Sequence, residues 1–183
     1  MKKFLALCLL ALLSSAPVQA QTVLFQNAPM IKAAIENNYD AMRSLLIKGT
    51  SANTTDLQGK TALIYAVNVP NLDMVKLLLD NKANPNQTDK NGNGPLFWAV
   101  GQGDPAVVDM LLKGGARVDL ENRQGVTPLM EAARTGHLEA VQRLIDGGAR
   151  VDRLDFSGRS ALMWAQDGRN PRVATALQKA GAH

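Results

Sequence analysis

The sequence contains few of the residues from which catalytic and metal sites are usually built. Its 183 residues include one cysteine and two histidines. The cysteine, Cys8, lies in an apolar run at the N-terminus, so the rest of the chain has neither a thiol nor a disulfide. One histidine, His183, is the last residue, and His137 alone is not enough for a usual zinc site. We therefore expect no catalytic residue, no metal and no cofactor.

Phosphate and calcium loops are also missing. The segment NGNG at 91–94 lacks the lysine–serine pair of a phosphate-binding loop. The segment that starts at Asp89 resembles the beginning of a calcium loop, but Val100 stands where the bidentate glutamate would have to be. The acidic residues of these turns are therefore interpreted as ordinary charges of solvated loops, and the chain is predicted not to be an enzyme.

Long apolar runs are absent apart from one at the N-terminus. Residues 2 and 3 are lysines, an apolar run extends from Phe4 to Leu13, and Val18-Gln19-Ala20 fits a signal-peptidase site. The run is too short for a permanent membrane anchor. We predict a signal peptide over 1–20, an N-terminal extension over 21–27, and export to a bacterial periplasm, with secretion from the cell as the alternative.

An excess of positive charge is absent once the signal is removed. The whole chain carries 20 basic and 16 acidic residues, a net charge of +4. Cleavage after Ala20 removes Lys2 and Lys3, which leaves 18 basic residues and a net charge of about +2. The chain is therefore not expected to bind nucleic acid or, after cleavage, a membrane.

What the sequence does contain is a repeat of 33 residues. Equivalent positions are occupied by the same or similar residues: Gly59, Gly92, Gly125 and Gly158; Ala66, Ala99, Ala132 and Ala165; Leu78, Leu111, Leu144 and Leu177. A more divergent copy begins at Ala28. In the fourth copy Thr127 is predicted to cap a helix that starts at Pro128 and ends at Gly136, and a second helix is predicted to end at Gly147-Gly148.

The period and pattern resemble the ankyrin repeat, in which a finger-like turn (here called the finger) precedes two helices. The resemblance implies an all-α solenoid of about five helix-turn-helix units over 28–183, with approximate boundaries at 28–56, 57–89, 90–122, 123–155 and 156–183. Each helix pair would bury its apolar face against its neighbours. Polar residues in the end units, Lys32 and Gln178, are expected to cap the stack, which favours a monomer.

The sequence departs from the family pattern in two ways. Family members often carry a histidine after the Thr-Pro-Leu motif that links neighbouring units, but Ile64, Phe97, Met130 and Met163 occupy that place. Packing is expected to replace those links. In addition, Pro70 and Arg169 replace the glycine between the two helices, so these two turns are expected to differ from the others.

The first helices carry a row of residues that family geometry places on the concave groove. The row contains Tyr65, Trp98 with Gln102, Glu131 with Arg134, and Trp164. Aromatic residues dominate the energetics of many protein interfaces. Two interpretations stay open: the rings contact a partner, or they fill gaps between units.

The finger tips form a second candidate surface. We select from them one basic residue in each unit and two exposed apolar residues as partner contacts: Leu57, Lys60, Lys90, Arg123, Phe156 and Arg159. The charged pairs Asp109–Lys113 and Glu139–Arg143 are interpreted as surface pairs within the second helices.

These observations predict a non-enzymatic module that binds another protein and stabilises or inhibits it. The resemblance extends to small exported bacterial ankyrin proteins, some of which are associated with support of oxidative-stress enzymes or with toxin immunity. The alternatives are a small-ligand binder or enzyme that uses the aromatic concave face, and a secreted effector that acts on a host protein.

Overall fold

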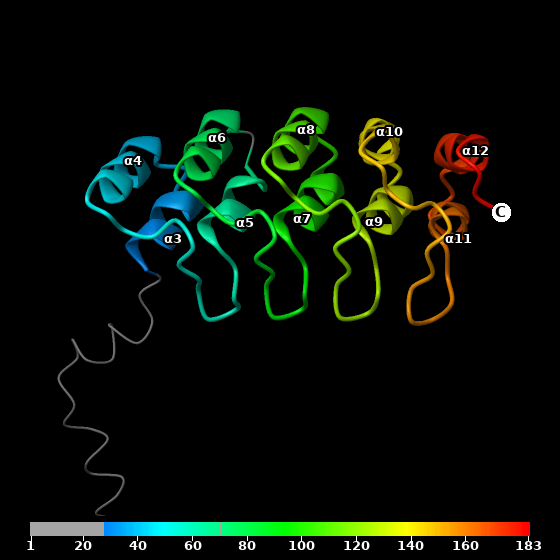
Figure 1. The fold of residues 1–183 in the computed structure, drawn as a ribbon, viewed down its shortest axis with the longest axis horizontal. Helices are drawn as coiled ribbons and strands as arrows, with labels where there is room; N and C mark the ends of the chain where they lie inside the picture. Colours follow the sequence, from blue (N-terminus) through cyan, green and yellow to red (C-terminus); the bar gives the residue numbers. More distant parts are fainter. Residues whose placement is uncertain (1–27, 70) are drawn as a thin grey trace, which may run out of the picture.

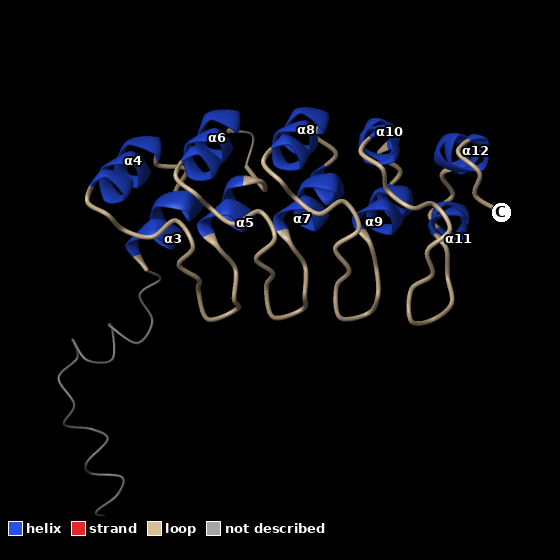
Figure 2. Ribbon diagram, in the orientation of Figure 1, coloured by secondary structure: helices blue, strands red, loops and turns tan. Residues whose placement is uncertain are grey.

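The computed structural model describes residues 28–69 and 71–183, and in this part of the chain it contains ten helices and no strand (Figure 1). The predicted signal peptide, the extension over 21–27 and Pro70 lie outside the described residues. The helices form antiparallel pairs that stack in chain order (Figure 2). An inner row contains α3 (Pro29–Ile35), α5 (Ala62–Ala66), α7 (Pro95–Gln102), α9 (Pro128–Thr135) and α11 (Ala161–Asp167). An outer row contains α4 (Tyr39–Ile47), α6 (Leu72–Asp80), α8 (Pro105–Lys113), α10 (Leu138–Asp146) and α12 (Pro171–Lys179).

Helix α9 begins and ends where the sequence predicts. The Thr127 hydroxyl accepts a hydrogen bond from the amide of Met130, and Pro128 occupies the first turn of α9. Gly136 ends that helix in the left-handed region, with φ 80°. In the fifth unit Arg169 adopts the left-handed conformation, with φ 55°, although a side chain disfavours it. The turn therefore keeps a left-handed residue without the glycine, but it differs from the others as expected, because α11 ends at Asp167, one repeat position earlier than α9.

The second unit has a shorter inner helix. Its helix α5 stops at Ala66, whereas α7 extends to Gln102, the position equivalent to Val69. This difference agrees with the expectation that the turn next to Pro70 would depart from the pattern, although Pro70 itself is outside the described residues.

The core runs along the whole stack between the two rows. The repeated alanines and leucines, including Ala132 and Leu144, are fully buried. Small side chains at the alanine positions let the inner helices approach each other closely, and each unit covers the apolar face of the next. The prediction that stacking buries these faces is confirmed.

Polar links between units occur, but at a position other than the family histidine. His137 Nδ1 lies 2.9 Å from the carbonyl of Val100 in the preceding unit. At the equivalent position, Asn170 Nδ2 donates to the carbonyls of Ala133 and Arg134, at 2.9 and 3.0 Å. Packing is therefore not the only replacement for the missing links, because residues at the start of the outer helices supply hydrogen bonds.

The fingers are also joined to each other through their backbones. The amide of Lys90 donates to the carbonyl of Gln58 at 2.9 Å, and the amide of Arg123 donates to the carbonyl of Asn91 at 2.9 Å. Phe156 continues the series by donating to Gln124 at 3.0 Å. Successive fingers thus hold one another at a fixed spacing (Figure 1).

One ion pair connects two outer helices, α8 and α10, across units. Arg143 lies 3.5 Å from Asp109 of the preceding unit, so it does not form the predicted pair with Glu139 in its own helix. At the C-terminal face Gln178 is exposed as expected, but Met163 and Leu154 are also exposed. That face is therefore less polar than the sequence suggested.

Candidate binding surface

Each of three fingers is built around an aspartate. The carboxylate of Asp89 is buried, and its Oδ1 accepts hydrogen bonds from the amides of Asn91 and Asn93 at 2.8 and 3.0 Å. Asp155 is also buried and accepts from the amides of Ser157 and Arg159 at 2.9 and 3.0 Å. The interpretation of these acids as ordinary solvated charges is wrong, because they fold the fingers from inside.

The second oxygen of each aspartate holds an aromatic ring. Hydrogen bonds join Tyr65 Oη to Asp56 Oδ2 (2.6 Å), Trp98 Nε1 to Asp89 Oδ2 (3.2 Å) and Trp164 Nε1 to Asp155 Oδ2 (3.0 Å). The rings are half-buried and pack against the core. The rings are therefore anchored to the scaffold and leave part of their surface exposed, and their contact with a partner stays a prediction.

These contacts change the acidity of two groups. Burial, followed by the Asp56 hydrogen bond and charge, raises the pKa of Tyr65 to about 12. Burial alone would raise the pKa of Asp155, but hydrogen bonds from Ser157, Arg159 and Trp164 outweigh it, so this pKa lies below its ordinary value. Asp155 is therefore an anion that its own finger stabilises.

Two of the predicted tip cations lie over the rings. Lys60 Nζ is 4.1 Å from the ring centroid of Trp98 in the next unit and 5.7 Å from that of Tyr65. Arg159 Cζ is 3.5 Å from the ring centroid of Trp164. Such cation–π contacts stabilise by about 0.5–1 kcal/mol at exposed sites. Lys60 and Arg159 therefore shape the surface from which a partner would be contacted.

The fourth unit lacks this arrangement. Asn122 replaces the finger aspartate, Val126 replaces the cation, and Glu131 replaces the ring. Asn122 still accepts from the amides of Gln124 and Val126, at 2.9 and 3.0 Å, so the finger keeps its form. Glu131 instead accepts two hydrogen bonds from Arg134, at 2.9 and 2.6 Å.

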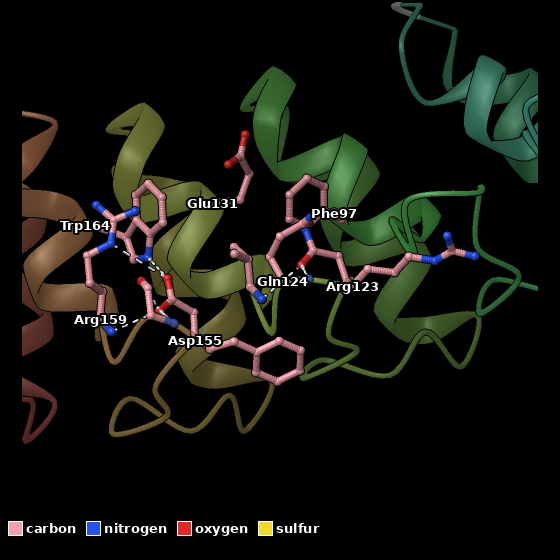
Figure 3. A pocket seen from close by; sticks show the side chains of 11 residues that line it. Phe97, Arg123, Gln124, Glu131, Asp155, Arg159 and Trp164 are labelled. Carbon is pink, nitrogen blue, oxygen red and sulfur yellow. Dashed lines mark hydrogen bonds and ion pairs between the residues drawn. The ribbon is translucent and has the colours of Figure 1, made fainter.

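A pocket of about 630 Å³ lies at this unit, between the fourth and fifth fingers and the inner helices (Figure 3). Apolar groups line much of it, from Phe97, Val126, Phe156 and Trp164. Polar and charged lining comes from Asn122, Arg123, Gln124, Glu131, Asp155, Ser157 and Arg159. Its volume lies in the range of pockets that enclose a drug-sized molecule or a large side chain.

The structure brings five of the predicted contact residues to this pocket: Arg123, Glu131, Phe156, Arg159 and Trp164. Leu57 and Phe156 are strongly exposed, at 69% and 76%, and Lys90 and Gln102 are also exposed. Gln102 donates to Asn68 at 3.1 Å, which links α7 to the turn that follows α5. Tyr65, Trp98 and Lys60 form a separate cluster at the second and third units.

The sequence analysis missed the residues that organise this surface. Asp56, Asp89 and Asp155 each precede their ring by nine residues, and this spacing was the available signal. It also missed Asn122, Val126 and Phe97 as pocket residues. The coordinated change at 122, 126 and 131 was visible in the repeat register.

Within 28–69 and 71–183, no group of three or more His, Cys, Asp and Glu residues is placed to hold a metal ion. None of the helices in these residues has the length and apolar character of a membrane span. The predictions of no metal and no cofactor stay predictions.

Comparison with known proteins gives one result. A family model described as "Ankyrin repeats (3 copies)" matches residues 30–122 and, a second time, residues 96–183. No curated protein matches the chain.

Proposed function

The chain belongs to the ankyrin-repeat family, whose repeats generally mediate protein–protein interaction and are typically non-enzymatic, and on that premise we propose that it docks on a partner protein through its fingers and ring-bearing inner helices. The observation that supports this most is the set of anchored rings. Each ring is fixed by a finger aspartate, and two cations cover ring faces. Rigid aromatic groups lose little side-chain entropy when a partner binds.

Exposed apolar side chains on the same side support the proposal. Leu57 and Phe156 extend from the second and fifth fingers, and each is more than two-thirds exposed. Burying such side chains under a partner would recover free energy that solvent exposure costs.

The proposed setting is the bacterial periplasm. The signal sequence predicted over 1–20 supports export, and secretion to a host is the alternative. In either place the chain would stabilise or block a protein, as an assistant of an oxidative-stress enzyme or as an immunity protein against a toxin. It is proposed to act as a monomer.

Site-specific photo-crosslinking tests the docking surface. A photoreactive amino acid at Gln102 or at Phe156 should give a discrete cross-linked product in cells that express the chain. The matched control places the same group at Lys113, an exposed position on outer helix α8. Equal yields of the same product from all three positions, or products from Lys113 alone, would contradict the proposed surface.

A small-molecule function is the second candidate, because the pocket at the fourth unit is large enough for one. The two candidate functions predict different results, because a small ligand would bind the purified chain without any partner protein.

A further inference from the structure

We propose that the pocket at the fourth unit receives an aromatic side chain of the partner, next to an acidic residue of the partner that pairs with Arg123. This inference rests on the proposed protein-binding function and specifies its chemistry. It is carried by three features: the missing ring, the apolar walls, and one cation that lacks a counter-charge.

The first feature is a break in a repeated pattern. In the second, third and fifth units a ring at positions 65, 98 and 164 covers the base of the finger. In the fourth unit the side chain of Glu131 is held by Arg134 and stands close to Gly101, 3.7 Å from where a Cβ would be. The space that a ring fills elsewhere therefore stays open, and it forms part of the 630 Å³ pocket.

The second feature is the nature of the walls. Phe97, Val126, Phe156 and Trp164 supply apolar surface to the pocket, and Figure 3 shows Phe97 and Trp164 on opposite sides of it. Phe156 packs closely on Gly125, where an added Cβ would lie 2.6 Å from the ring, so this exposed wall is held in place from below. A flat apolar side chain fits between such walls better than a hydrated charge does.

The third feature is the charge balance at the rim. Glu131 is paired with Arg134, and Arg159 lies near both Asp155 (3.8 Å) and Asp167 (2.9 Å). Arg123 is exposed and has no ion pair among the described residues. An acidic neighbour of the inserted side chain would complement it, and such a rim contact mainly sets specificity.

Short peptides give a direct test. The ¹⁵N-labelled full chain is titrated with three acetylated and amidated tetrapeptides: Gly-Asp-Trp-Gly, Gly-Lys-Trp-Gly and Gly-Asp-Ala-Gly. We expect Gly-Asp-Trp-Gly to shift the amides of Val126, Glu131 and Phe156 with a Kd of about 1 mM, typical of one buried side chain. The lysine peptide should bind several-fold more weakly, and the alanine peptide should cause no shifts in this region.

A variant that fills the pocket can be designed from the fifth unit of the same chain and serves as the matched control. The triple change Asn122→Asp, Val126→Arg and Glu131→Trp gives the fourth unit the residues of the fifth, in which the finger and inner helix already fold with Asp155, Arg159 and Trp164. This variant should unfold at a midpoint no lower than that of the natural chain and bind the tryptophan peptide at least tenfold more weakly. Phe156→Ala, at an exposed position, provides a second variant and should weaken binding several-fold. Arg123→Ala should remove the preference for aspartate over lysine and retain the need for tryptophan.

Three results would overturn the inference: no shifts at the pocket, unchanged binding to the triple variant and to Phe156→Ala, or equal affinity for the peptide and for N-acetyltryptophanamide, which carries no carboxylate. The last result would indicate a small-molecule site. A partner cross-linked from Gln102 in the triple variant as efficiently as in the natural chain would show that the pocket inference fails and the docking function stands. If no partner is cross-linked to the natural chain at all, the proposed docking function itself is contradicted.

Discussion

Replacing Asp155 by asparagine isolates the hydrogen bond that anchors a ring. The asparagine Oδ1 can still accept from the amides of Ser157 and Arg159, as Asn122 does from its own finger in the fourth unit. The second carboxylate oxygen becomes an NH₂ group, which cannot accept from Trp164 Nε1 at 3.0 Å. The finger should therefore keep its form and lose its ring anchor.

The expected loss of stability comes mainly from the hydrogen bond between Asp155 and Trp164, because the ion pair of Asp155 with Arg159 is long, at 3.8 Å, and its arginine is exposed. A hydrogen bond to a charged acceptor contributes about 1.5–3 kcal/mol, and the half-buried indole can recover part of this from water. We expect Asp155→Asn to lower the free energy of unfolding by about 2 kcal/mol. Urea unfolding followed by circular dichroism measures it, and an unchanged m-value would show that the denatured state is unaffected. Asp152→Asn, at an exposed carboxylate in the same unit, is the control and should change stability by less than about 0.5 kcal/mol.

A double-mutant cycle tests the cause. Trp164→Phe removes the donor, so Asp155→Asn should cost about 1–2 kcal/mol less in that background. Equal costs in both backgrounds would refute the role of the indole bond.

The contribution of Asp155 to the free energy of unfolding should depend on pH. The pKa of Asp155 is lowered in the folded chain, so its contribution to stability is complete above the unfolded-state pKa of about 4 and is lost as the pH falls through that value toward the folded pKa. Asparagine does not titrate, so the stability gap between the natural chain and Asp155→Asn should narrow from pH 7 to pH 3. A constant gap would contradict the lowered pKa.

The remaining predictions concern the core, the groove and export. Leu144→Ala, at a fully buried site, should cost about 2–5 kcal/mol and lower the melting temperature of the whole stack, and an unchanged melting temperature would be inconsistent with the packing of α10. Trp98→Ala should weaken partner binding by more than about 2 kcal/mol and also reduce stability, because the ring is hydrogen-bonded and packs on the core, whereas Lys113→Ala should change neither property; titration calorimetry and thermal melts on the same samples separate the two effects. The exported form should lack the 20 residues before Gln21 by mass spectrometry, and a cytoplasmic protein that retains Cys8 would exclude the proposed compartment.

The repeat architecture could be predicted because its information is local and repeated. Thr127, Pro128 and Gly136 determine where a helix starts and stops within ten residues of sequence, and the repetition of their pattern supports each assignment. The burial of Leu144 followed from the same register.

The surface was harder to predict because its contacts cross the finger. The bond between Asp155 and Trp164 joins residues nine positions apart, which become neighbours only because the finger turns back on the inner helix. Lys60 lies over a ring of the next unit, and Arg143 pairs with Asp109 of the preceding one. Helical spacing within one unit cannot reveal such contacts, since they depend on how neighbouring units stack.

The fixed spacing of the links between units makes the chain divisible into interchangeable parts. Removing residues 90–122 would bring the carbonyl of Gln58 to the amide of Arg123, and Asn86, which accepts from the amide of Arg117, to that of Arg150. Each severed bond would find a chemically equivalent partner, so a shorter stack should still assemble. At the new junction Lys60 would meet Glu131 in place of Trp98, and an ion pair would replace a cation–π contact. Loss or duplication of a whole unit would thus alter the binding face and leave the scaffold intact.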